Sequence, residues 1–320
     1  MVVAKAKKTR NIPGNPAKRG TVATPPPKPV TVRDWIGAAR LRTLPLAITP
    51  VIIGTGAAIL ADGDREFHWV IALFCLVVAV TLQIGVNFAN DYSDGIRGTD
   101  DFRVGPARLT ASGRIPAKRV LYVALAFFAV AALAGLAIVI RTQQWWMLAV
   151  GAACIVAAWF YTGGKRPYGY HALGEVFVFV FFGLVATLGT TWVQALFLPQ
   201  EAWIGAVAAG LLAVAVLLAN NLRDIDQDRE AGKRTLSVVI GALGTKILYT
   251  VLVALAFGIA GWLALFYPIA WLAFFALLAA GPAIVIVWAH RTPRELITAL
   301  ALTSISSPIY GFFLAWAFVG

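Results

Sequence analysis

The feature that most constrains this chain is a series of long apolar runs that continue almost to its last residue. A helix needs about 20 mainly apolar residues to cross the hydrocarbon core of a bilayer. Nine runs approach or exceed that length, at residues 44–61, 68–90, 118–140, 145–161, 172–198, 203–221, 246–267, 269–290 and 296–319. Their length favours helices over buried strands, and they lack the short alternating segments of a membrane β-barrel. The sequence therefore predicts an all-α polytopic membrane protein with nine transmembrane helices.

The composition agrees with a lipid environment. Hydrophobic residues make up 60% of the 320 residues and charged residues 13%, whereas soluble domains have roughly 45–50% and about 25%. Cys75 and Cys154 both lie inside apolar runs, so the sequence predicts neither a disulfide framework nor a thiolate zinc site. The three histidines are scattered and have no metal-ligand spacing.

The basic residues are distributed unevenly, and Lys and Arg accumulate on the cytoplasmic side of membrane proteins. With a cytoplasmic N-terminus, the cytoplasmic segments hold ten, six, two, five and two of the 27 Lys and Arg residues, leaving only Arg65 and Arg141 outside. This split predicts a multi-pass membrane protein with its N-terminus in the cytoplasm and its C-terminus outside. Topology and attraction to anionic lipid then explain the formal net charge of +12 without a nucleic-acid partner.

The N-terminal segment differs from the rest of the chain. Residues 1–31 are rich in Lys, Arg and Pro and contain no apolar core of a signal peptide, which predicts a disordered basic cytoplasmic tail before a transmembrane domain at 32–320. Residues 32–43 combine Trp35, Ile36 and Leu41 with three arginines. Two interpretations remain open for this segment: an amphipathic helix in the membrane interface, or a plain linker.

Eight of the 15 acidic residues gather after two of the apolar runs. They are Asp91, Asp94, Asp100 and Asp101 after the second run, and Asp224, Asp226, Asp228 and Glu230 after the sixth. Four runs separate the two clusters, so both are expected on the cytoplasmic side. In each cluster an Asn stands four residues before the first Asp, which places both residues on one helical face.

Helical spacing defines two polar faces. They consist of Asn87, Asp91 and Asp94, and of Asn220, Asp224 and Asp228. Two facing groups of carboxylates would repel one another without a cation between them. Mg²⁺ prefers one or two carboxylates together with phosphate oxygens, so the pattern predicts a magnesium site that binds a diphosphate.

The alternative is that these acids are ordinary solvated loop residues. Asp226 and Glu230 point away from the second face, and Asp100 and Asp101 lie farther along their loop. We expect these four to be solvated.

Basic residues that could hold phosphate oxygens are expected on the same side as the two clusters. Arg223 adjoins Asp224, and Lys233 follows Asp228. A glycine-rich loop at 161–170 contains Lys165 and Arg166, and glycine allows close approach of the backbone to a ligand. The loop lacks the spacing of a phosphate-binding Walker motif.

Taken together, the motif Asn87-x₃-Asp91-x₂-Asp94, the loop 161–166 and the motif Asp224-x₃-Asp228 resemble those of the UbiA superfamily of intramembrane aromatic prenyltransferases. Finer motifs resemble its branch that prenylates dihydroxynaphthoate in menaquinone synthesis. These include Arg42-Thr-Leu-Pro45, Gly105-Pro106, Arg166-Pro-Tyr-Gly-Tyr170 with Gly174-Glu175, and Asn220-Asn221-x-Arg223-Asp224. The resemblance covers residues 32–320. Gly98 stands where many superfamily members carry a further Asp, so Asp100 could take its place.

The resemblance implies a fold, a reaction and a cofactor. The fold would be a UbiA-type bundle of nine helices with both aspartate motifs at the cytoplasmic side. The reaction would transfer a polyprenyl group from an allylic polyprenyl diphosphate to 1,4-dihydroxy-2-naphthoate with decarboxylation, assisted by Mg²⁺ and giving demethylmenaquinone. The expected phosphate ligands are Arg42, Lys165, Arg166, Arg223 and Lys233. Asp91 or Asp224 would either deprotonate the acceptor as a catalytic residue or bind metal.

Two alternative functions remain open. A prenyltransferase of this type could act on another acceptor, such as hydroxybenzoate, homogentisate or haem. An ion-coupled secondary transporter is the alternative from another class, but transporters place such acids near the bilayer midplane, whereas these clusters end their helices. Prenyl chain length and oligomeric state are not encoded in any motif.

Overall fold

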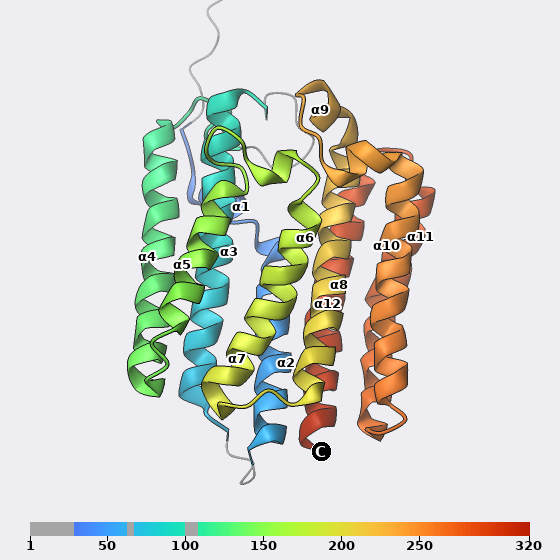
Figure 1. Cartoon of the computed structure of the whole chain (residues 1–320). Helices are drawn as coiled ribbons and strands as arrows, with labels where there is room; N and C mark the ends of the chain where they lie inside the picture. The colour runs from blue at the N-terminus through green and yellow to red at the C-terminus, as the bar shows by residue number, and fades with distance from the viewer. Residues whose placement is uncertain (1–28, 63–66, 100–107) are drawn as a thin grey trace, which may run out of the picture.

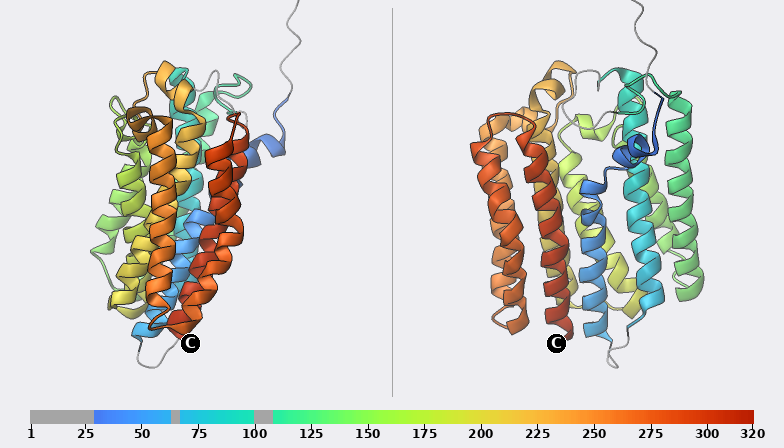
Figure 2. Two further views of the ribbon diagram at one scale, coloured as in Figure 1. Left: turned by 90° about the vertical axis from the view of Figure 1, so that its right-hand side faces the viewer. Right: turned by 180° about the vertical axis from the view of Figure 1, so that it is seen from behind.

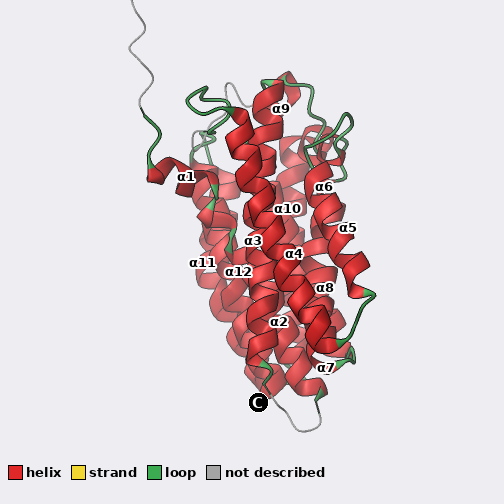
Figure 3. Cartoon of the chain, turned by 90° about the vertical axis from the view of Figure 1, so that its left-hand side faces the viewer, coloured by secondary structure: helices red, strands yellow, loops and turns green. Residues whose placement is uncertain are grey.

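The computed structural model describes residues 29–62, 67–99 and 108–320, and these are almost entirely helical (Figure 1). Residues 1–28 of the predicted tail lie outside the described residues. Arg65, Asp100, Asp101 and Gly105-Pro106 also lie outside them. The long helices stand side by side and successive ones run in opposite directions (Figures 1, 2 and 3). The elements are α1 (Val32–Ala38), η1 (Leu41–Thr43), α2 (Pro45–Ala61), α3 (Trp69–Arg97), α4 (Ala117–Thr142), α5 (Met147–Phe160), η2 (Tyr168–Tyr170), α6 (Gly174–Val178), η3 (Phe179–Val185), α7 (Ala186–Ala195), α8 (Gln200–Arg223), α9 (Ile225–Glu230), α10 (Leu236–Leu263), η4 (Pro268–Ala276), α11 (Leu277–Ala289) and α12 (Glu295–Val319).

The helices are long and apolar enough for a multi-pass membrane protein. Seven described segments qualify as single spans by length and composition: α3, α4, α6 to α7, α8, α10, η4 to α11, and α12. An eighth is possible if the bent pair Val32–Thr43 and Pro45–Ala61 counts as one span. Each predicted run contains a helix, but α5 has 14 residues and is about 21 Å long, which is short of the ~30 Å hydrocarbon core. The all-α membrane class is therefore confirmed, whereas nine spans is more than length and composition give.

The segment before the first span is a helix rather than a plain linker. Thr31 caps α1, and its hydroxyl and backbone N–H both contact the Asp34 carboxylate. The helix stops early because Arg40 has the left-handed backbone angle φ of 55°, and the chain bends by 46° before α2. The linker interpretation is wrong, and the helix is shorter than residues 32–43.

Helix α8 forms the centre of the bundle. It packs against α10, α12, α2 and η3, and its buried face consists largely of Ala, Leu and Val. Small residues allow the closest approach: a Cβ atom added to Gly183, in the π-helical turn η3, would lie 2.6 Å from the Cα atom of Gly210 in α8. The backbone packing of the central helix thus depends on glycine at this crossing.

We expect Gly183→Ala to destabilise the folded protein by about 1–3 kcal/mol, because neither the Gly210 backbone nor the Ala206 carbonyl oxygen can retreat from the new methyl group. The measurement is the midpoint of thermal unfolding of the detergent-solubilised chain. Gly258→Ala is the matched control, since Gly258 is also helical but has open space around its Cβ position. A midpoint in Gly183→Ala equal to that of the control would contradict the packing argument.

The two acidic motifs lie at one end of the bundle. Helices α3 and α8 both run toward the end that carries α9, and the C-terminus lies at the opposite end (Figure 1). The four intervening runs predicted this common side. Asp91 and Asp94 of α3 therefore lie at the same end of the bundle as Asp224, which follows α8, and Asp228 of α9.

Candidate active site

Three polar side chains from the last turns of α3 line a cavity: Asn87, Asn90 and Asp94. Each is buried and held by a distant segment of the chain. The Asn87 amide donates to the Ala39 carbonyl oxygen at 3.0 Å, and the Thr162 hydroxyl donates to Asn90 Oδ1 at 2.7 Å. These bonds tie the polar face of α3 to the end of α1 and to the glycine-rich loop.

Asp91 has a different position from the other polar residues of α3. Its carboxylate is fully buried, and its two oxygens accept hydrogen bonds from the backbone N–H groups of Leu109 and Thr110, each at 2.9 Å. Asp91 does not line the cavity, whereas Arg108, which directly precedes Leu109 in the chain, does. The predicted face of Asn87, Asp91 and Asp94 is thus divided, because Asp91 fixes the turn that presents Arg108.

The second motif contains a buried ion pair. Arg223 donates to both oxygens of Asp224, at 2.7 and 2.6 Å, and to Asn220 Oδ1 at 3.0 Å. Asn220 lines the cavity, but Arg223 and Asp224 do not. The guanidinium group therefore orients the acidic motif, whereas the sequence predicted that it would hold phosphate.

Lys233 lines the cavity and connects the second motif to it. Its ammonium group lies 3.7 Å from Asp228 Oδ1, and its backbone N–H donates to the Asp228 carbonyl oxygen at 2.7 Å. Asp228 is buried, whereas Asp226 is exposed and pairs with Arg229, and Glu230 is exposed. Asp226 and Glu230 thus point away from the site, as their helical spacing predicted.

Tyr170 joins the two motifs. Its hydroxyl donates to Asp94 Oδ1 at 2.8 Å, and the Lys233 ammonium lies 5.2 Å from the centre of its ring. Burial and the neighbouring Asp94 carboxylate raise the pKa of the Tyr170 phenol. The phenol therefore stays protonated at neutral pH and keeps donating to Asp94.

Besides Arg223, three other predicted phosphate ligands do not line the cavity. Lys165 and Arg166 are exposed and do not line the cavity, and Arg97 donates to the carbonyl oxygens of Thr162 and Gly164 in the same loop. Arg42 is also exposed, and Arg40 lines the cavity instead. The left-handed conformation of Arg40 ends the helix. Arg40, two positions before Arg42, therefore faces the cavity.

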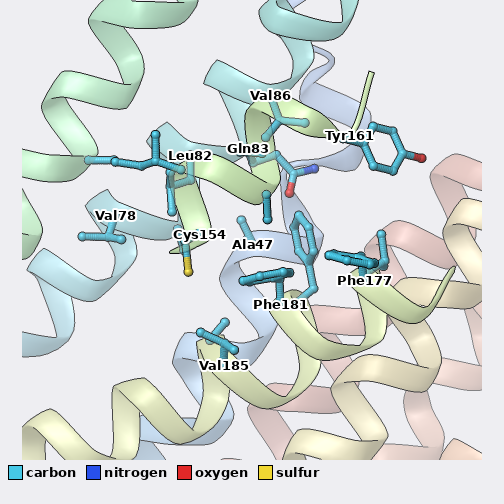
Figure 4. Close-up of a pocket in the computed structure, with 18 of the residues that line it drawn as sticks. Ala47, Val78, Leu82, Gln83, Val86, Cys154, Tyr161, Phe177, Phe181 and Val185 are labelled. Atoms are coloured by element: carbon cyan, nitrogen blue, oxygen red, sulfur yellow. The ribbon is translucent and has the colours of Figure 1, made fainter. Parts of the chain in front are cut away.

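The cavity has a volume of about 520 Å³ and two chemically different parts. The polar part contains the amides of Asn87, Asn90, Asn220 and Asn221, together with Asp94, Lys233, Arg40 and Arg108. The apolar part is deeper and is lined by α2, α3, α4, α5, η3 and α7. In Figure 4, Val78, Leu82, Cys154 and Val185 surround this part, and the rings of Phe177 and Phe181 lie between it and Tyr161.

A sequence comparison decides the family. The profile of the UbiA prenyltransferase family matches residues 48–318. The chain belongs to the UbiA prenyltransferase family. The assignment to the UbiA superfamily that the motifs predicted is therefore confirmed.

Several relatives of this UbiA-family chain have an assigned activity. It is 48% identical over 293 residues to a 1,4-dihydroxy-2-naphthoate octaprenyltransferase from Mycobacterium tuberculosis, covering 89% of this chain and 96% of the relative. It is 41% identical over 218 residues to the Escherichia coli protein of the same name, covering 66% and 70%. The motifs indicated this branch of the superfamily.

The fold also matches solved structures. A UbiA homolog from Archaeoglobus fulgidus, bound to GPP and Mg²⁺, has a TM-score of 0.64 at 16% identity, covering 88% of this chain and 99% of that chain. The apo structure of a UbiA homolog from Aeropyrum pernix has a TM-score of 0.63, covering 81% and 94%. At this identity the likeness shows the fold alone, and it confirms the UbiA-type bundle.

The donor set of the UbiA-family site fits Mg²⁺ only in combination with a ligand. Within residues 29–62, 67–99 and 108–320, no three His, Cys, Asp or Glu side chains gather as a metal site of their own. The polar part of the cavity offers single carboxylate and amide oxygens from two helices. Mg²⁺ accepts such sparse protein ligands when phosphate oxygens complete its octahedron.

The sequence interpretation missed four lining residues of the polar part: Arg40, Asn90, Arg108 and Asn221. Asn90 directly precedes Asp91, and its position in the motif was the available signal. Asn221 donates to Glu175 at 2.9 Å, a contact between two motifs that the sequence separates by 46 positions. Nothing local to Arg40 or Arg108 distinguishes these arginines from their basic neighbours.

Proposed function

We propose that this chain transfers a polyprenyl group from an allylic polyprenyl diphosphate to 1,4-dihydroxy-2-naphthoate, with loss of carbon dioxide, to give demethylmenaquinol, the reduced form of demethylmenaquinone. The observation that carries the proposal is a single cavity whose polar end continues into a long apolar chamber. A polyprenyl diphosphate has the same division between charged head and hydrocarbon tail. The names of the relatives from M. tuberculosis and E. coli support the choice of acceptor.

In the proposal, the polar end binds the diphosphate. Asn87, Asp94 and Asn220, which line the cavity, and Asp228, which lies beside Lys233, would hold Mg²⁺ together with diphosphate oxygens. The GPP and Mg²⁺ bound to the A. fulgidus homolog support this cofactor. Bound there, Mg²⁺ would supply Lewis-acid stabilisation of the leaving diphosphate. Lys233, Arg40 and Arg108 line the same part of the cavity and would add charge-assisted hydrogen bonds to phosphate oxygens.

The apolar chamber would protect the reactive carbon. When the allylic carbon–oxygen bond breaks, the diphosphate leaves with the electron pair and an allylic cation remains. Water would capture this cation, so a chamber lined by Val, Ala, Leu and Phe side chains keeps it available for the acceptor. The carboxyl-bearing ring carbon then forms the new carbon–carbon bond, and carbon dioxide and a proton leave to restore the aromatic ring.

The contacts of Asp91 and Asp224 support positioning roles in this reaction. Both oxygens of Asp91 accept backbone hydrogen bonds, and both oxygens of Asp224 accept hydrogen bonds from Arg223. Neither residue lines the cavity. We therefore assign acceptor deprotonation to neither residue and propose that Asp91 shapes the Arg108 turn.

We further propose nine membrane passes with a cytoplasmic N-terminus and an external C-terminus in a bacterial plasma membrane. The distribution of basic residues and the alternating direction of the helices support this topology (Figure 1). The short helix α5 would then cross together with its flanking residues.

Reporter fusions test this topology. We expect fusions after Arg97, Lys165 and Lys233 to report the cytoplasm, and a fusion after Arg141 to report the opposite side, because the positive-inside rule fixes the end that carries the motifs. The measurements are alkaline phosphatase activity and the fluorescence of a fluorescent protein, with both reporters fused at each position. An external signal after Lys233 would separate the acidic motifs from cytoplasmic Mg²⁺.

An acceptor panel tests the function itself. Membranes that contain the full chain are incubated with a polyprenyl diphosphate, Mg²⁺ and one of dihydroxynaphthoate, hydroxybenzoate, homogentisate or haem. We expect a prenylated product with dihydroxynaphthoate. Transfer to hydroxybenzoate but not to the naphthoate would preserve the family and overturn the acceptor assignment.

A further inference from the structure

A buried carboxamide stands one helical turn below Asn87, on the same face of α3. Gln83 is 6% exposed and lines the cavity. Its amide nitrogen donates to the Thr43 carbonyl oxygen at 2.9 Å, at the junction of η1 and α2. This bond fixes the orientation of the amide, because the opposite rotamer would face one carbonyl oxygen with another.

The carbonyl oxygen of Gln83 is a buried acceptor on a side chain that lines the cavity. Within the part of the chain that the structure describes, Oε1 is buried and accepts no hydrogen bond. Figure 4 shows the carboxamide extending from α3, with its oxygen directed toward the part of the cavity where Ala47, Phe177 and Phe181 lie. A buried acceptor without a donor is costly, so this oxygen is suited to a ligand that brings a donor.

The surroundings restrict what that ligand is. Leu82, Val86 and Ala47 are apolar, and Phe177 and Phe181 add aromatic surface, so the place fits a flat apolar ring. A carbonyl oxygen accepts from a hydroxyl group and repels a carboxylate. The rise from Gln83 to Asn90 is about 10 Å along the helix, which leaves room for an aromatic ring between the carboxamide and the polar end.

We propose that Gln83 Oε1 accepts a hydrogen bond from the 4-hydroxyl group of the naphthoate acceptor and so selects a ring that carries a hydroxyl group at this position. This inference rests on the proposed function. The 1-hydroxyl group is adjacent to the carboxylate and donates to it within the molecule, so the 4-hydroxyl group is the donor that is left for the protein. The carboxyl-bearing carbon then faces the polar end, where the allylic carbon must be.

The test compares two ligands and two side chains in the full-length protein. Equilibrium binding of 1,4-dihydroxy-2-naphthoate and of 1-hydroxy-2-naphthoate is measured in lipid nanodiscs, without prenyl diphosphate. We expect the wild-type chain to bind the dihydroxy compound about tenfold more tightly, and Gln83→Met to bind both within about twofold. Gln83→Asn should also lose the preference, because its oxygen is withdrawn by one methylene group.

Gln194→Met is the matched control. Gln194 is also a buried glutamine whose amide nitrogen donates to a carbonyl oxygen, but it does not line the cavity. The Gln194→Met variant should retain the tenfold preference for the dihydroxy compound. A purely structural role of Gln83, acting through Thr43 and the neighbouring Arg40, would weaken both ligands equally and raise the KM for prenyl diphosphate.

Two results overturn the inference while leaving the proposed function intact: a wild-type chain that prenylates the naphthoate but has no preference for the 4-hydroxyl group, or Gln83 variants that keep the full preference. A wild-type chain that neither binds nor prenylates 1,4-dihydroxy-2-naphthoate overturns the proposed function, and the inference with it.

Discussion

Replacing Asp94 with Asn should lower kcat/KM for prenyl transfer by about 10²- to 10³-fold while the chain still folds and inserts. The substitution keeps the size of a side chain that lines the cavity and accepts from Tyr170 at 2.8 Å. It removes the negative charge that would hold Mg²⁺ against the diphosphate. Steady-state kinetics in detergent, with circular dichroism as a check of folding, measure the effect.

Asp226→Asn is the control for this change. Asp226 belongs to the same acidic cluster as Asp228, but its side chain is 82% exposed and its ion pair is with Arg229 on the surface of α9. We expect its kcat/KM to remain within about twofold of wild type, because exposed pairs contribute little. Equal losses in Asp226→Asn and Asp94→Asn would show that the cavity does not define the site.

The second large effect concerns the cation at the polar end. Lys233→Met should raise the apparent KM for the prenyl diphosphate by about 10- to 100-fold, because a charge-assisted hydrogen bond to a phosphate oxygen is lost. The loss should appear mainly in KM if this contact is made equally in the ground and transition states. The measurement is the initial rate as a function of prenyl diphosphate concentration at saturating acceptor.

Lys165→Met provides the comparison for Lys233→Met. Lys165 lies in the glycine-rich loop that the sequence predicted to bind phosphate, but its side chain is exposed and does not line the cavity. We expect a KM change of less than about threefold. If Lys165→Met raised KM as much as Lys233→Met, the diphosphate would bind at the loop rather than in the cavity.

The helices could be predicted because their signal is local. Each apolar run is long enough to indicate a helix by itself, and the count of four runs between the acidic motifs was sufficient to place both at one end (Figure 1). The end of a short element such as α1 is harder to predict, because it depends on the conformation of a single residue, Arg40.

The site could be predicted only in part, because helical spacing does not say where the other helices lie. Asn87 and Asp94 were placed on one face with Asp91, and only the turn at Leu109 and Thr110 decides that Asp91 faces elsewhere. The choice of Arg40 over Arg42 similarly depends on a left-handed residue that the sequence does not mark. The apolar chamber is formed jointly by several helices, so no single motif encodes it.

The most direct test of the proposed reaction is to follow the carboxyl carbon of the acceptor. The purified full-length chain is incubated with a polyprenyl diphosphate and 1,4-dihydroxy-2-naphthoate labelled in its carboxyl group, with Mg²⁺ or with a chelator. We expect one labelled carbon dioxide for each prenylated product, and neither when the metal is chelated. A prenylated product that retains the label, or no product with this acceptor in the presence of Mg²⁺, would contradict the proposed reaction.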